Sequence, residues 1–166
     1  MKKGKTVAIV PGSFDPITYG HIDIAKRASE LYDFVYVAVM INDQKKYMFS
    51  IDERKRIANE ALCKIEGVSV ISSEGMLWEL ARDLCADAIV KGYRNDVDLE
   101  YEKRMAEYNA QHYPSAKTVL LKADERLDTL SSTIVRERII QGMSLEGFLP
   151  QEAVEIVNKI LLSRDN

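Results

Sequence analysis

The stretch TVAIVPGSFDPITYGH, residues 6–21, decides how this chain folds. It opens with a largely β-branched apolar run that stops at Pro11 and Gly12, as a buried strand stops at a turn. Beyond the turn, apolar residues recur at helical spacing at Ile22, Ala25 and Ala28. His21 therefore belongs to the first turn of a predicted helix, where unpaired N–H groups and the helix dipole favour an anion.

The turn between this strand and helix has the residue types of a phosphate site. Gly12 and Gly20 would let a ligand approach the backbone closely, the Ser13 hydroxyl is a donor, and two prolines stiffen the segment. Taken alone, the same residues also fit a plain strand-to-helix connection that is capped by Thr18 and carries a surface histidine.

Length and composition favour one α/β domain spanning residues 1–166. A net charge of −3 argues against a general basic surface for nucleic acid. The apolar run at 35–41 is too short to span a bilayer, so we expect no membrane partner and a cytoplasmic location. Cys63 and Cys85 lack Cys-x-x-Cys spacing and are expected to be reduced thiols in or near the core, without a role in metal binding or catalysis.

Strand and helix patterns alternate along the chain, which predicts parallel strands joined by helical crossovers. The strands are expected near residues 6–11, 34–41, 68–72, 87–91 and 117–122, and the helices near residues 20–32, 51–65, 75–85, 98–112, 131–142 and 151–163. Ser50 and Glu53 form a predicted capping box, Pro150 fits a first helical position, and Gly142 fits a helix end. The predicted fold is a Rossmann-like, doubly wound, five-stranded parallel sheet in the order 3-2-1-4-5.

In such a sheet, ligands bind at the carboxyl ends of the strands where the strand order reverses, here between the first and fourth strands. The polar, glycine-containing loops follow the strands that flank this point. They are residues 11–21, 91–96 and 124–132, after the first, fourth and fifth strands. The sequence therefore predicts that three loops converge on one crevice.

A second motif, LSSTIVR at residues 130–136, follows the fifth strand and opens a helix. By itself it fits capping serines and a solvated Arg136. Together with the T-x-G-H run at 18–21, it resembles the paired signatures of the nucleotidylyltransferase superfamily. Further runs at 45–50, 91–94 and 98–102 are similar, in order along nearly the whole chain, to the bacterial phosphopantetheine adenylyltransferases.

This resemblance implies a reaction, a cofactor and an assembly. The reaction is transfer of the adenylyl group of ATP to 4′-phosphopantetheine, which gives dephospho-coenzyme A and pyrophosphate with Mg²⁺. The resemblance further implies a cytoplasmic homohexamer in which coenzyme A can occupy the same site as a feedback ligand.

The resemblance also assigns roles to residues. His21 would be catalytic and would stabilise the transition state. The ATP-binding positions would be Ser13, Phe14, His21, Gly92, Tyr93, Arg94, Glu102, Leu127, Asp128, Thr129, Leu130, Ser131, Ser132 and Thr133. The acceptor-binding positions would be Ser13, Lys45, Leu77 and Lys91, and no residue is expected to ligate a metal.

The chain departs from the commonest family pattern at four positions. Lys91 stands where arginine is more usual, Ser13 where threonine is frequent, Tyr19 where asparagine is frequent, and Leu130 where the signature has isoleucine. The change at Lys91 matters most, because a lysine offers a point charge in place of the planar, two-pronged grip of a guanidinium. It bears on affinity for the acceptor more than on activity.

Three other functions compete with this interpretation. One is a nucleotidylyltransferase of the same superfamily with a phosphocholine-like, glycerol phosphate or mononucleotide acceptor. Another is a catalytically silent nucleotide-binding or sensor domain. The third is a fragment of an aminoacyl-tRNA synthetase, which the lack of a tRNA-binding extension and of a basic surface bias argues against.

Overall fold

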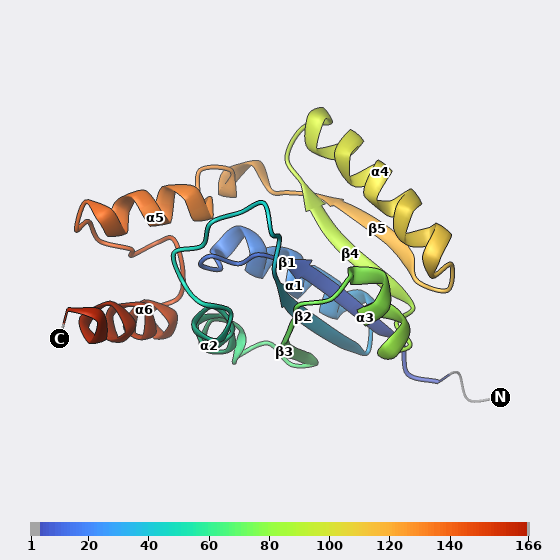
Figure 1. Ribbon diagram of the computed structural model, residues 1–166, viewed down its shortest axis with the longest axis horizontal. Coiled ribbons are helices and arrows are strands. Elements are labelled where there is room, and N and C mark those ends of the chain that lie inside the picture. Colours follow the sequence, from blue (N-terminus) through green and yellow to red (C-terminus); the bar gives the residue numbers. More distant parts are fainter. Residues whose placement is uncertain (1–3, 166) are drawn as a thin grey trace.

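The computed structural model of the protein describes residues 4–165 and contains a five-stranded, all-parallel sheet in the order β3-β2-β1-β4-β5 (Figure 1). The strands are β1 (Val7–Gly12), β2 (Phe34–Met40), β3 (Val68–Ser73), β4 (Ala88–Tyr93) and β5 (Lys117–Lys122). The helices are α1 (Tyr19–Leu31), α2 (Ile51–Leu62), α3 (Leu77–Asp83), α4 (Asp96–His112), α5 (Ser132–Ile140) and α6 (Gln151–Arg164). The predicted fold class and strand order are confirmed, and residues 1–3 and 166 of the expected domain lie outside the described part.

Most predicted element boundaries agree closely with the structure. One short element was not predicted, the 3-10 helix η1 (Glu125–Leu127) between β5 and α5. It begins where the Asp124 side chain accepts a hydrogen bond from the Arg126 N–H, at 3.0 Å. Such a local side-chain turn has no periodic apolar pattern, so hydrophobic periodicity cannot predict it.

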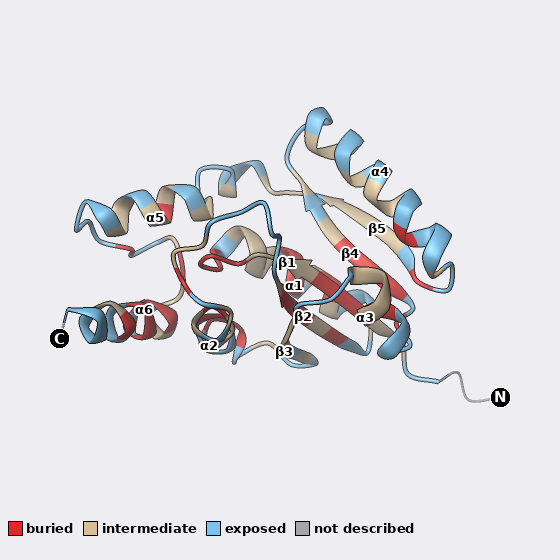
Figure 2. Ribbon diagram, in the orientation of Figure 1, coloured by how far each residue is buried: buried red, intermediate tan, exposed pale blue. Residues whose placement is uncertain are grey.

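The sheet is covered on both faces, as alternation along its strands requires. Val10, Val37 and Val90 belong to the larger core, with α1, α2 and α6, whereas Ile9 and Ile89 belong to a smaller core with α3. Figure 2 shows buried residues concentrated in the central strands and in α2 and α6. Because β1 is the middle strand and is buried on both faces, the turn that follows Gly12 starts from a rigid position.

Local chemistry accounts for several element ends. The predicted capping box is present, because the Ser50 N–H donates to Glu53 Oε2 at 2.8 Å and the Glu53 N–H donates to Ser50 Oγ at 3.2 Å. Gly142 follows the last residues of α5 with φ +66°, as predicted for a helix end. Pro150 is the N-cap of α6, one position before the predicted one, and its carbonyl accepts from the Val154 N–H.

Both cysteines are free and exposed, so the expectation of core thiols was wrong. Each cysteine is adjacent in sequence to a buried residue. Leu62 is buried immediately before Cys63 at the end of α2, and Ala86 is buried immediately after Cys85 in the turn toward β4. Among the described residues, no helix is long and apolar enough to cross a membrane.

Candidate active site

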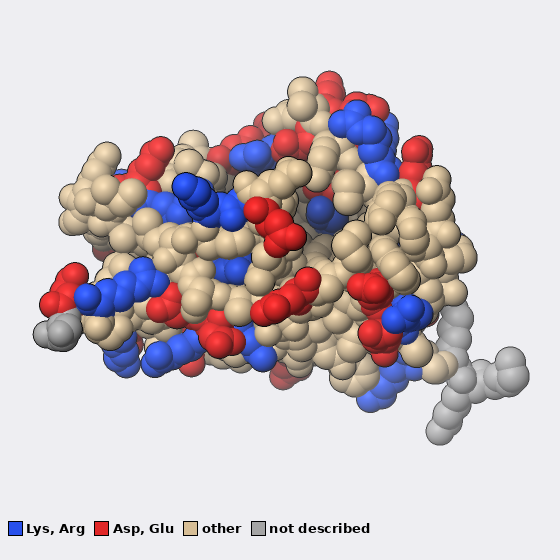
Figure 3. All heavy atoms as spheres, viewed as in Figure 1, with Lys and Arg blue, Asp and Glu red and all other residues tan. Residues whose placement is uncertain are grey.

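A cavity of about 710 Å³ lies at the carboxyl ends of β1 and β4. Its lining comes from the loops that follow β1, β4 and β5 and from the loop between β2 and α2. In Figure 3 the surface is hollowed in the middle of the molecule, with Lys or Arg atoms deep in the recess. This is the predicted crevice, and its volume is typical of a small-molecule site.

The two sequence motifs meet at this cavity. Ser132 Oγ donates to the Pro16 carbonyl at 2.8 Å, and Arg136 Nη1 donates to the Asp15 carbonyl at 2.8 Å. Ser131 is the N-cap of α5, where its Oγ accepts from the Ile134 N–H at 3.2 Å. The serine hydroxyls are thus engaged in holding the fold, and the first N–H groups of α5 are the donors that this motif presents to an anion.

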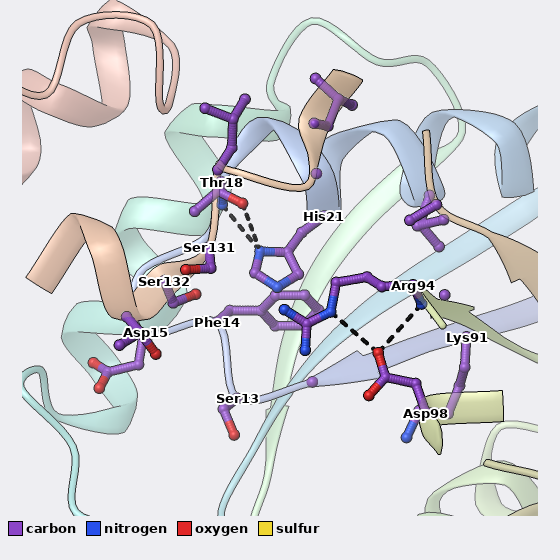
Figure 4. A pocket seen from close by; sticks show the side chains of 18 of the residues that line it. Ser13, Phe14, Asp15, Thr18, His21, Lys91, Arg94, Asp98, Ser131 and Ser132 are labelled. Atoms are coloured by element: carbon purple, nitrogen blue, oxygen red, sulfur yellow. Dashed lines mark hydrogen bonds and ion pairs between the residues drawn. The ribbon is translucent and has the colours of Figure 1, made fainter. Parts of the chain in front are cut away.

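His21 lies in the first turn of α1 with its ring orientation fixed by Thr18 (Figure 4). Its Nδ1 is 3.1 Å from the Thr18 backbone nitrogen and 3.2 Å from Thr18 Oγ1. Because a backbone N–H can only donate, Nδ1 is the acceptor, and the neutral imidazole carries its proton on Nε2. Burial, followed by the charge of Arg94, lowers the pKa of His21 to about 4. At neutral pH the ring is therefore an uncharged donor through Nε2.

Phe14 packs against the His21 ring, and its position accounts for the glycine at position 12. Its backbone has φ +48°, its side chain is 3% exposed, and its ring meets the His21 ring edge-on at 5.1 Å between centroids. A Cβ on Gly12 would lie 2.8 Å from Phe14 Cζ. Gly12 is thus required by the packing of Phe14, and because it also lines the cavity its role in ligand approach stays a prediction. A Cβ on Gly20 would make only ordinary contacts, at 3.6 Å or more.

The charged groups around the cavity are largely arranged in pairs. Lys91 Nζ lies 2.9 Å from Glu102 Oε2, and both side chains are mostly buried. Arg94 Nε lies 3.1 Å from Asp98 Oδ2 at the start of α4. A phosphate that binds Lys91 or Arg94 must therefore compete with a carboxylate. No group of three or more His, Cys, Asp or Glu that could hold a metal occurs among residues 4–165.

Most of the predicted site residues line this one cavity. They are Ser13, Phe14, His21, Lys45, Lys91, Gly92, Arg94, Glu102, Leu127, Asp128, Leu130, Ser131, Ser132 and Thr133. Three of the predicted residues are not part of its lining. Leu77, the first residue of α3, packs against the smaller core, Tyr93 ends β4, and Thr129 lies in the loop before α5.

Several lining residues were not predicted as site residues. Thr18 was expected as a helix cap and as the first residue of the T-x-G-H run, and it also fixes the tautomer of His21. Arg136 belongs to the second motif, where it fits a solvated charge only if the motif is taken by itself. Tyr47 lies in the run at 45–50, and its hydroxyl oxygen is 3.5 Å from Ser13 Oγ. Thr18 contacts a residue of its own motif, whereas Arg136 and Tyr47 contact residues of the turn after β1, which lie far away in sequence.

Comparison with known proteins points in the same direction. The family model described as cytidylyltransferase-like matches residues 9–138. A phosphopantetheine adenylyltransferase of Clostridium novyi is 41% identical over 155 residues, covering 93% of this chain and 96% of the relative. A protein of the same name from Caldanaerobacter subterraneus is 44% identical, covering 90% and 93% of the two chains. Another, from Flavobacterium psychrophilum, is 42% identical and covers 90% and 97%.

The His21 environment predicts a pH effect on stability. The imidazole titrates near 6.5 in the unfolded chain and near 4 in the folded one, so the unfolded state binds more protons between these values. The His21 contribution to the free energy of unfolding should therefore be complete above pH 6.5 and decline as the pH falls toward 4. Urea unfolding across this range should show a flatter profile for His21→Asn, and identical slopes would contradict the assignment.

The contact between Gly12 and Phe14 predicts the effect of a single methyl group. Gly12→Ala should force the buried Phe14 ring away and cost about 1–3 kcal/mol of stability, as overpacking does. The His21 ring, which Phe14 supports, should move with it. Thermal unfolding measures the first effect and the His21 NMR signals the second. Gly4→Ala, whose added Cβ meets no atom within 4 Å, is the matched control.

Proposed function

The chain belongs to the cytidylyltransferase-like family and, within it, to the phosphopantetheine adenylyltransferases, and from this we propose that it adenylylates 4′-phosphopantetheine with ATP. The products would be dephospho-coenzyme A and pyrophosphate. The observation that carries the proposal is the shared cavity, in which the Nε2–H donor of His21, the start of α5 and several cations surround one space. We further propose that residues 1–166 act as one nucleotidylyltransferase domain.

The chemistry needs charge stabilisation more than proton transfer. A phosphate monoester is largely ionised near neutral pH and can attack the α-phosphorus of ATP without a general base. The new P–O bond forms as the bond to the pyrophosphate breaks, and negative charge accumulates on the oxygens around phosphorus. Donors that are fixed in advance lower the energy of that state, and holding both substrates in one cavity supplies the positioning.

The two ends of the cavity suit different substrates. At one end, His21, Arg94 and the segment 127–133 would bind ATP, with the N–H groups of α5 near its phosphates. At the other end, Ser13, Lys45 and Lys91 would bind the acceptor phosphate. Leu77 and the remaining predicted positions outside the lining, Tyr93 and Thr129, stay part of the proposal as contacts made beyond the cavity.

The carboxylates that line the cavity decide whether the protein itself could bind Mg²⁺. Most of these carboxylates are engaged with cations of the chain, as in the pairs of Glu102 with Lys91 and of Asp98 with Arg94. These residues do not fit a protein-held metal site. In our proposal, Mg²⁺ enters as part of the ATP substrate, bound to its phosphates, and neutralises charge there.

Assembly, regulation and location complete the proposal. Apolar side chains such as Val97, 80% exposed, and Ile140, 77% exposed, are available for contacts between copies in a homohexamer. Coenzyme A contains the pantetheine and adenylate parts of the product, which supports its binding in the same cavity as a feedback ligand. The proposed location is the cytoplasm, where ATP is available.

The role of His21 is tested by its removal. His21→Ala should lower kcat by about 10²–10³-fold, the usual effect of losing one donor aimed at developing charge. ATP affinity should change little, because the other phosphate donors remain. Pyrophosphate release with 4′-phosphopantetheine measures kcat, and ATP titration measures binding. His112→Ala is the control: it removes the second histidine, which lies outside the cavity lining, and its kcat should equal that of the wild type. Undiminished turnover in His21→Ala would refute the proposed catalytic role of His21.

The role of Lys91 is tested by separating the two substrates. Lys91→Ala removes a cation and leaves the Glu102 carboxylate without its partner, so the KM for 4′-phosphopantetheine should rise more than the KM for ATP. Lys103→Ala, which removes an exposed lysine of α4, is the control. An equal rise in both constants would show that the two ends of the cavity are assigned wrongly. Glycerol phosphate, phosphocholine and mononucleotides, tried as acceptors in the same assay, test the competing substrates.

A further inference from the structure

Arg54, in the first turns of α2, is a buried arginine directly behind the cavity. Its side chain is 1% exposed and is absent from the cavity lining. Its Nη1 donates to the Ser13 carbonyl at 2.6 Å and to the Met40 carbonyl at 2.9 Å. Its guanidinium carbon lies 3.9 Å from the centre of the Tyr47 ring. Arg54 thus joins α2, the end of β2 and the turn after β1.

No carboxylate contacts Arg54 directly, although the charge of the buried Asp15 acts on it at longer range. No ion pair within 4 Å links it to any described Asp or Glu, and its Nε is buried without a hydrogen-bond partner. Lys91, Arg94 and Arg136 all have carboxylate partners around the same cavity. A buried cation with no carboxylate in contact is costly, and Asp15 also lies beside Arg136. An anion that binds in front of Arg54 therefore recovers part of that cost.

The bond to Ser13 also fixes the orientation of one peptide group. In a planar trans peptide the C=O and N–H point in opposite directions. Because the Ser13 carbonyl points toward Arg54, the N–H of Phe14 points away from it. Among the described residues this N–H has no acceptor, although Phe14 is almost fully buried and lines the cavity.

Tyr47 holds the arginine from the cavity side. Its ring stacks on the guanidinium, and its hydroxyl oxygen accepts from the Asn42 N–H at 2.7 Å and lies 3.5 Å from Ser13 Oγ. The loop between β2 and α2 is thereby tied to both Arg54 and the Ser13 turn. Contacts with Arg54 and with Tyr47 thus reach the Ser13 turn from two sides.

We propose that Arg54 is a positioning residue that sets the Ser13–Phe14 peptide and the Ser13 hydroxyl to receive a phosphate group, whose negative charge, together with that of Asp15, balances the buried guanidinium. The identity of that phosphate, on ATP or on the acceptor, rests on the proposed function. The positioning itself does not, because it follows from the contacts of Arg54. Arg54 touches no substrate in this arrangement and acts through the turn.

The test compares a phosphate ligand with a phosphate-free one by calorimetry. For Arg54→Met, affinity for inorganic pyrophosphate should fall about 10- to 100-fold, the effect of losing charge-assisted binding, while affinity for adenosine stays within about twofold. Arg54→Lys should recover most of the pyrophosphate affinity, because an ammonium keeps the charge and can reach both carbonyls. Arg56→Met removes an exposed arginine of the same helix and should match the wild type.

The outcomes separate positioning from a merely structural role. Loss of both affinities in parallel, or a pyrophosphate affinity in Arg54→Met equal to that in Arg56→Met, would overturn the proposal, as would a lack of recovery in Arg54→Lys. If Arg54→Met does not fold, Arg54→Gln decides, since it keeps a donor for the carbonyls but removes the charge; wild-type pyrophosphate affinity would then contradict it. Absence of adenylyl transfer by the wild type would refute the proposed function but leave this comparison intact.

Discussion

The site depends above all on Asp15, a buried carboxylate at the centre of three segments. Its two oxygens accept hydrogen bonds from the Met48 and Phe49 N–H groups at 2.9 and 3.0 Å, which anchors the loop before α2. Its carbonyl accepts from Arg136, whose guanidinium also lies 3.8 Å from the carboxylate. At 3% exposure, the carboxylate is stable only because these donors and this cation surround it. Asp15 therefore ties together the turn after β1, the loop between β2 and α2, and helix α5. The cavity lies between these segments.

The fold and the place of the site could be predicted because they follow from short-range patterns. The run before Pro11 and the helical spacing after His21 define a strand, a turn and a helix without any knowledge of distant partners. Topology does the rest, since the carboxyl ends of parallel strands meet at one edge and bring the loops after β1, β4 and β5 together. The location of the second motif at this edge could be predicted on the same basis, because the motif follows the last strand.

What could not be predicted are the contacts between residues far apart in sequence. The sequence does not show that Gly12 faces the Phe14 ring, that Ser132 bonds to Pro16, or that Arg54 lies beneath Ser13. An arginine in an amphipathic helix is ordinarily read as solvated, and only packing reveals that this one is buried. The prediction that the cysteines are buried failed for a related reason. At the end of an element, one residue is buried and the next is exposed, and the sequence pattern does not locate this change to within one residue.

In the proposed mechanism, a neutral His21 suits a site that would hold several phosphate groups. An imidazolium would attract the anionic substrate and the transition state alike, and uniform binding does not accelerate the chemical step. In that mechanism, a neutral ring whose Nε2–H direction is fixed by Thr18 would donate most strongly to the oxygen on which charge builds. Phosphates that approach the ring would raise its pKa, starting from the value of about 4 to which burial and the charge of Arg94 lower it. The closely packed shell of Phe14 and Thr18, which produces that burial, therefore serves the electrostatics of the site as well as the position of the ring.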